Sequence, residues 1–161
     1  MRSYRKGAVA GGFTLIELLV VIAIIAILAV VVFVALNPVQ RFADARNSSR
    51  ISDVNSLLTA VHQSIVDNGG ALPTGLSAGM AETQLGTAAS GCTTTVGGAA
   101  CGTADACANL TTPLAKYLAS IPTDPQGSAA KVGYSVTVNA NSIVTVRACS
   151  AERGATIQVS R

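Results

Sequence analysis

The sequence predicts an α+β fold in which one long N-terminal helix packs its second half against a small antiparallel sheet. Three observations lead to this prediction. Residues 13–36 are almost entirely apolar, residues 51–65 carry apolar side chains at three- and four-residue steps, and the last thirty residues alternate as strands do. A helix laid on one face of an antiparallel sheet satisfies all three patterns.

The apolar stretch from Phe13 to Leu36 has only two polar residues, Thr14 and Glu17. As a helix it is about 36 Å long, which is enough to cross a hydrocarbon core of about 30 Å. A secretory signal peptide has an apolar region of only about 7–15 residues, so this segment is too long for one. We therefore expect a single membrane span.

Charge is distributed unevenly along the chain. The formal net charge is +3, but the first twelve residues hold three basic residues and no acidic one, and the remainder carries eight of each sign. The positive-inside rule places the basic N-terminus in the cytoplasm and the rest of the chain outside. A near-neutral remainder gives little support for nucleic-acid binding, and we predict none. The basic residues before the span are Arg2, Arg5 and Lys6.

Glu17 is unusual because a carboxylate within an apolar helix costs about 2.5–3.5 kcal/mol on insertion scales. One interpretation is that its side chain reaches back to the cytoplasmic interface. The other is that a second molecule supplies a cation. If the leader is cut after Gly12, Phe13 gains a free amino group, and a neighbouring copy's ammonium would lower the cost of burying Glu17.

The segment Gly11-Gly12-Phe13-Thr14-Leu15-Ile16-Glu17 resembles the class III signal of type IV pilins and type II secretion pseudopilins. The resemblance implies that a prepilin peptidase cuts after Gly12 and N-methylates Phe13, and that Glu17 guides assembly. It also implies a pilin-like fold, with the first half of the helix protruding and the second half packed on the head.

The second half of the long helix, residues 37–68, is amphipathic. Pro38 either ends or kinks the helix, since proline removes a hydrogen bond and clashes with the preceding turn. The periodicity after it favours continuation to Asp67, before Asn68-Gly69-Gly70 stops the helix. The expected core face holds Ile51, Val54, Leu58, Val61 and Ile65. The expected polar face holds Arg46, Asn47, Arg50, Asp53 and Gln63.

Residues 69–161 form the predicted globular head, and its first part is a long loop rich in Gly, Ala, Ser and Thr. Four cysteines in an exported domain predict two disulfides, with three pairings open. Proximity favours Cys92 with Cys101 and Cys107 with Cys149. A zinc site is a weaker alternative, because no two cysteines have a C-x-x-C spacing.

Thr112–Ala119 is expected to be a short helix, and three strands are expected near Val132–Val138, Ile143–Cys149 and Thr156–Ser160. Between them, Ile121-Pro122-Thr123-Asp124-Pro125 resembles a Pro-x-Asp-Pro motif of pseudopilins and some pilins, where calcium is sometimes bound. Asp124 is only a weak calcium candidate, because one carboxylate supplies few of the six to eight oxygens required. We predict no metal and no cofactor.

The sequence therefore predicts a structural prepilin with a cleaved leader at 1–12, an assembly helix at 13–36, and the amphipathic half and head beyond. The expected partners are other pilin copies, a prepilin peptidase, and an assembly platform with its ATPase. The expected location is the cytoplasmic membrane and then an extracellular pilus. The alternative is a periplasmic pseudopilus for secretion or DNA uptake. An enzyme is not expected, since no catalytic constellation accompanies the single histidine.

Overall fold

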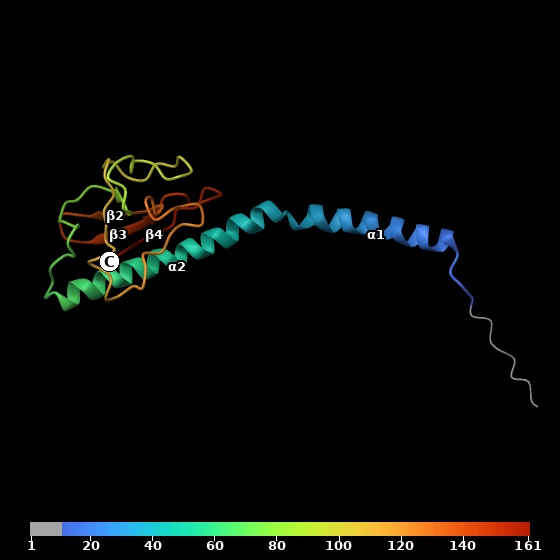
Figure 1. Ribbon diagram of the computed structural model, residues 1–161, viewed down its shortest axis with the longest axis horizontal. Helices are drawn as coiled ribbons and strands as arrows, with labels where there is room; N and C mark the ends of the chain where they lie inside the picture. Colours follow the sequence, from blue (N-terminus) through green and yellow to red (C-terminus); the bar gives the residue numbers. More distant parts are fainter. Residues whose placement is uncertain (1–10) are drawn as a thin grey trace, which may run out of the picture. The chain divides into compact units, whose positions relative to one another are not determined.

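The computed structural model describes residues 11–161, so most of the predicted leader lies outside the described residues. Two compact units are present, one up to Arg41 and the other from Phe42 to Arg161. The α+β prediction is confirmed: helix α1 (Leu15–Leu36) and helix α2 (Pro38–Asp67) precede a four-stranded antiparallel sheet (Figure 1).

Helices α1 and α2 meet at Asn37, which adopts a left-handed conformation with φ 41°. The residue before a proline is disfavoured in the right-handed helical region, so α1 ends at Leu36. Pro38 is the first residue of α2, where its missing N–H leaves no hydrogen bond unmade. In the described chain, the helical stretch that contains α1 is long and apolar enough to cross a membrane.

The sheet has the order β1-β2-β3-β4, and each neighbouring pair is antiparallel. Strands β2 (Tyr134–Val138), β3 (Val144–Ala148) and β4 (Gln158–Ser160) fall within the three predicted segments. The sequence did not indicate β1 (Thr83–Gln84), because two residues inside a loop of low complexity are too few for a periodic signal.

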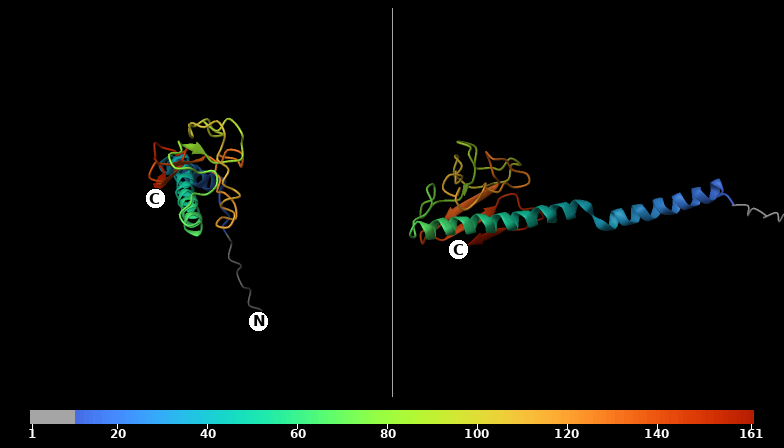
Figure 2. Two further views of the ribbon diagram at one scale, coloured as in Figure 1. Left: turned by 90° about the vertical axis from the view of Figure 1, so that its left-hand side faces the viewer. Right: turned by 60° about the horizontal axis from the view of Figure 1, so that its bottom comes forward.

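The sheet lies beside α2 (Figure 2). Alternate side chains of β2 and β3 pack against α2 to form the core of the head. Tyr134 is fully buried, and its hydroxyl donates a 2.6 Å hydrogen bond to Asp53 on α2. The buried residues of this layer are Val54, Leu57, Leu58, Val61, Tyr134, Val136, Val138, Val144, Val146 and Ala148.

Two details of the predicted helix faces are wrong. Ile51 is 51% exposed, although it was expected in the core, and Arg50 is fully buried, although it was expected on the polar face. The predicted core residues Val54, Leu58 and Val61 are buried, and Arg50 joins this face one helical turn before Val54. Arg50 lies on this face because charged partners meet it there.

The expected short helix at 112–119 is also wrong, because this segment is a succession of turns. Leu118 N donates to Leu114 O, four residues earlier, as in an α-helix. However, Tyr117 N donates to Leu114 O and Ala115 N donates to Thr112 O, and both bonds span only three residues, as in a 3-10 turn. A segment this short cannot propagate one helical pattern without a long apolar face to stabilise it.

The two predicted disulfides are present, but the pairing that proximity favours is wrong. Cys92 is bonded to Cys107, and Cys101 to Cys149. The reason is a short hairpin in which Cys101 N donates to Thr93 O. The register of this hairpin places Thr93, and not Cys92, opposite Cys101.

Candidate assembly site

The predicted assembly residues lie together where α1 begins. Thr14 is the N-cap: its hydroxyl oxygen accepts a hydrogen bond from Glu17 N at 3.2 Å. In return, Glu17 Oε2 accepts hydrogen bonds from Thr14 N at 2.7 Å and from Thr14 Oγ1 at 2.8 Å. This reciprocal arrangement is a capping box, and it holds the carboxylate at the positive end of the helix dipole.

The second carboxylate oxygen of Glu17, Oε1, accepts no hydrogen bond from the described residues. Phe13, whose backbone nitrogen would become the new N-terminus after cleavage, is 83% exposed. The site thus presents an open carboxylate oxygen and an accessible residue 13 at the same end of the helix.

The surface of α1 is apolar on all sides, and none of its residues is buried. Even Val20, one of its best covered large side chains, is 48% exposed. A helix that is hydrophobic all round requires an apolar environment, either a membrane or other helices. The length and composition of α1, together with its basic leader, therefore indicate membrane anchoring.

Comparison with known proteins identifies the same N-terminal region. The family model described as the prokaryotic N-terminal methylation motif matches residues 9–33. No curated protein and no solved structure matches the chain. The matched motif is the class III prepilin leader of type IV pilins and pseudopilins, a structural group of proteins. The motif and the pilin-like α+β architecture together support a protein of the type IV pilin or pseudopilin family.

A buried ion pair holds the head on α2. Arg50 Nε lies 2.5 Å from Asp124 Oδ2, and Arg50 Nη2 lies 3.1 Å from Asp124 Oδ1. The side chains of Arg50 and Asp124 are 0% and 2% exposed. Arg50 Nη1 also donates to Glu152 Oε1 at 2.9 Å. Because the guanidinium and carboxylate planes match in a bidentate pair, this contact fixes the register of the helix against the head.

Asp124 has little capacity left to bind a metal ion. Besides Arg50, its Oδ1 accepts a 2.8 Å hydrogen bond from Gln126 N. Gly133, with φ +87°, lies so close that an added Cβ would be 2.7 Å from Asp124 Cβ. No group of three potential metal-ligating side chains occurs within residues 11–161. The Pro-Thr-Asp-Pro turn therefore presents Asp124 to Arg50.

Glu152 joins the same cluster from the turn between β3 and β4. Arg46 Nε donates to Glu152 Oε1 at 2.6 Å, and Asn47 Nδ2 donates to the Glu152 carbonyl at 3.0 Å. The hydrogen bond from Arg46 and a further one from Arg50 lower the pKa of Glu152 to about 2. Burial acts to lower the pKa of Arg50, but hydrogen bonds to Asp124 and Glu152 outweigh it and raise the pKa.

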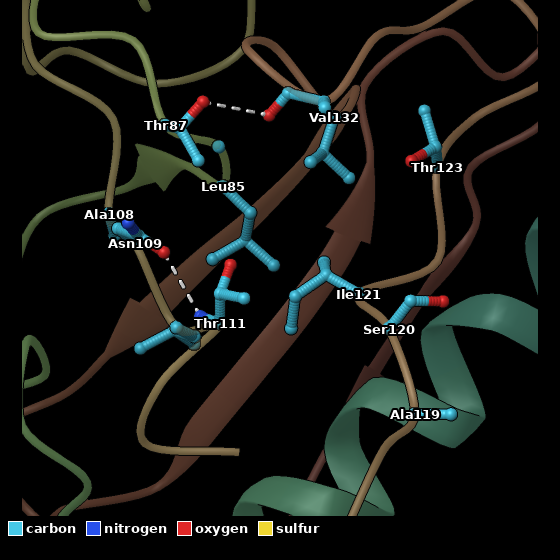
Figure 3. A pocket seen from close by; sticks show the side chains of 13 residues that line it. Leu85, Thr87, Ala108, Asn109, Thr111, Ala119, Ser120, Ile121, Thr123 and Val132 are labelled. Carbon is cyan, nitrogen blue, oxygen red and sulfur yellow. Dashed lines mark hydrogen bonds between the residues drawn. The ribbon is translucent and has the colours of Figure 1, made fainter. Parts of the chain in front are cut away.

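The head also contains a cavity of about 410 Å³ beside the end of β1 (Figure 3). Leu85, Ile121 and Val132 contribute apolar side chains to its lining, and Thr87 and Asn109 contribute polar ones. None of its lining residues carries an ionisable side chain. The cavity therefore lacks the acid, base or activated nucleophile that a catalytic site requires.

The residues at the start of α1 belong to a motif that is visible in the sequence, whereas the cluster at Arg50 was not predicted from it. The sequence signal for the burial of Arg50 was its spacing: it precedes Val54 by four residues and Leu57 by seven, which places all three on one face of a helix. An arginine on an apolar face indicates a buried carboxylate partner, and Asp124 in its rigid turn was the candidate.

Proposed function

We propose that this chain is a prepilin, the precursor of a structural subunit of a type IV pilus. The observation that carries the proposal is the apolar surface of α1, in which no residue is buried and whose first turn holds Glu17 within the methylation motif. The head buries its own core without α1. The apolar helix is therefore available to pack against copies of itself in a filament.

In the proposed pathway, residues 1–12 remain cytoplasmic and residues 13–36 span the membrane. Residues 37–68 continue as the amphipathic half of the helix, and residues 69–161 form the exported head. A prepilin peptidase cuts after Gly12 and methylates the new N-terminus at Phe13. An assembly platform and its ATPase then move the subunit from the cytoplasmic membrane into the filament.

Glu17 would provide specificity during assembly. Moving α1 from lipid to a helix bundle exchanges one apolar environment for another, so the hydrophobic effect contributes little. A new contact must favour the bundle, and the open oxygen of Glu17 is suited to the Phe13 ammonium of a neighbouring subunit. Two charges that meet in an apolar environment cost far less than either one alone.

The test is Glu17→Ala, with Asp67→Ala as a matched control. Asp67 is an exposed carboxylate at the far end of α2, where it binds Lys116. We expect Glu17→Ala to be processed at Gly12 but absent from sheared filaments, whereas Asp67→Ala assembles. Normal amounts of filament from Glu17→Ala would contradict the charge-pairing mechanism.

A second candidate function is a pseudopilin of a secretion or DNA-uptake system. The Pro-Thr-Asp-Pro turn is the feature that brings it forward, because its sequence resembles a motif of major pseudopilins, although some pilins share that motif. Long filaments in the extracellular sheared fraction would support the pilus. Processed subunits that remain in the cell envelope would support the pseudopilus.

A further inference from the structure

The disulfides of the head are interleaved along the chain. The first cysteine is bonded to the third and the second to the fourth, with sequence separations of 15 and 48 residues. The Cα–Cα distances are 5.3 and 5.2 Å, and no cysteine in the described residues is free. If the cysteines nearest in sequence were oxidised first, the chain would therefore carry a non-native disulfide pairing.

An unfolded chain favours non-native bonds. Cys92 and Cys101 are nine residues apart, and Cys101 and Cys107 are six apart, whereas the native Cys92–Cys107 loop is 15 residues. Loop closure becomes less frequent roughly as the −3/2 power of length. Only about one in seven first-formed bonds among these three cysteines would then be native.

Some of the contacts that surround the native pairs come from later parts of the chain. Thr87 N and Ala88 N donate to the carbonyls of Ala129 and Ala130. Arg147 Nη2 donates to Ala100 O at 3.4 Å across the disulfide loop. During export these segments arrive after the first three cysteines. A hairpin without such support is marginally stable in water.

A mispaired chain cannot reach the native head without exchanging its bonds. In the native head Cys92 and Cys101 are both fully buried, and each is bonded to another cysteine. A Cys92–Cys101 bond therefore occupies two sulfur atoms that the native bonds need.

We infer that maturation of the head requires a thiol–disulfide isomerase as a partner. This inference rests on the proposed export, because both bonds need an oxidising compartment. A disulfide oxidant first removes two electron pairs and four protons from the four thiols. The isomerase then acts without net oxidation or reduction, on a chain paired Cys92–Cys101 and Cys107–Cys149.

The exchange proceeds through one mixed disulfide. The isomerase thiolate attacks Cys92 Sγ and releases the Cys101 thiolate. Cys101 attacks Cys149, forms the native Cys101–Cys149 bond and releases the Cys107 thiolate. Cys107 attacks Cys92 in the mixed disulfide, forms the second native bond and regenerates the isomerase thiolate.

The test is oxidative refolding of the full chain in detergent micelles. The protein is reduced in urea and then refolded with oxidised glutathione, without added thiol, in the presence or absence of a purified disulfide isomerase. Disulfide-linked peptides are quantified over time by mass spectrometry. Without the isomerase, we expect about one in seven early bonds to be native. With it, the native pair should rise several-fold and become dominant.

The control is the double variant Cys101→Ser with Cys149→Ser, which leaves Cys92 and Cys107 as the only pair. Because no mispairing is then available, the isomerase should not change the yield of this bond. Native pairing from the earliest times without isomerase would overturn the inference, as would a wild-type yield that the enzyme does not change. Neither outcome depends on leader cleavage or filament formation, so the proposed function is tested separately.

Discussion

Arg50→Met tests whether the buried ion pair holds the head on α2. Methionine fills much of the apolar volume of the arginine side chain but removes every charge-assisted hydrogen bond to Asp124 and Glu152. Asp124, with its side chain 2% exposed, is left buried without its cation. Removing one partner of such a pair typically costs about 3–5 kcal/mol. That loss is a large fraction of the about 5–15 kcal/mol that stabilises a typical domain.

The assay is urea unfolding of the purified full chain in detergent micelles. The signal must report on the head alone, because α1 is expected to stay helical in the micelle. The chain has no tryptophan, but Tyr134 is fully buried in the head, so tyrosine near-UV circular dichroism follows its unfolding. The slope of the transition shows whether the folded states are comparable.

Arg153→Met is the matched control, since it removes an arginine from an exposed ion pair with Asp44. Surface pairs contribute about 1 kcal/mol or less, so this variant should unfold close to the wild type. The double variant Arg50→Met with Asp124→Asn removes the unpaired charge and should recover part of the loss. If Arg50→Met lost no more stability than Arg153→Met, the buried pair would not be the main attachment of the head.

Three other variants and conditions test the head. The unperturbed pKa of Glu152 is 4.5, and in the folded head the hydrogen bond from Arg46 is the largest cause that lowers this pKa to about 2. The contribution of ionised Glu152 to stability is therefore complete above pH 4.5 and is lost as the pH falls toward 2. Urea midpoints should therefore fall more on acidification in the wild type than in Glu152→Gln. Replacing Cys101 and Cys149 by serine opens a 48-residue loop and should cost about 4 kcal/mol in the chain-entropy model, which calorimetry would measure. Gly133→Ala should lose more than about 1 kcal/mol in urea unfolding, because it strains a positive φ and crowds the carboxylate of the buried pair.

The elements with strong local patterns were predictable from the sequence. The apolar run of α1, the helical period of α2 and the alternation of β2 and β3 each extend over enough residues to reveal their periods. The motif that contains Glu17 could also be recognised from the sequence, because its residues are consecutive in the chain.

The remaining features depend on contacts between residues that are distant in the sequence. The partner of Arg50 lies 74 residues away, and that of Cys101 lies 48 residues away. Cys92 and Cys101 are close in the sequence, but the register of one hairpin places Thr93, and not Cys92, opposite Cys101. Loop length cannot reveal such a register, which is why the proximity argument favoured the wrong disulfides.

The most direct test of the proposed filament role is mass spectrometry of the N-terminal peptide from sheared filaments of the native host. The proposal predicts a chain that begins at N-methylated Phe13 and is enriched in the filament fraction. A chain that retains Met1 and occurs only in membranes would contradict it, because the leader would be uncut and α1 would serve only as an anchor.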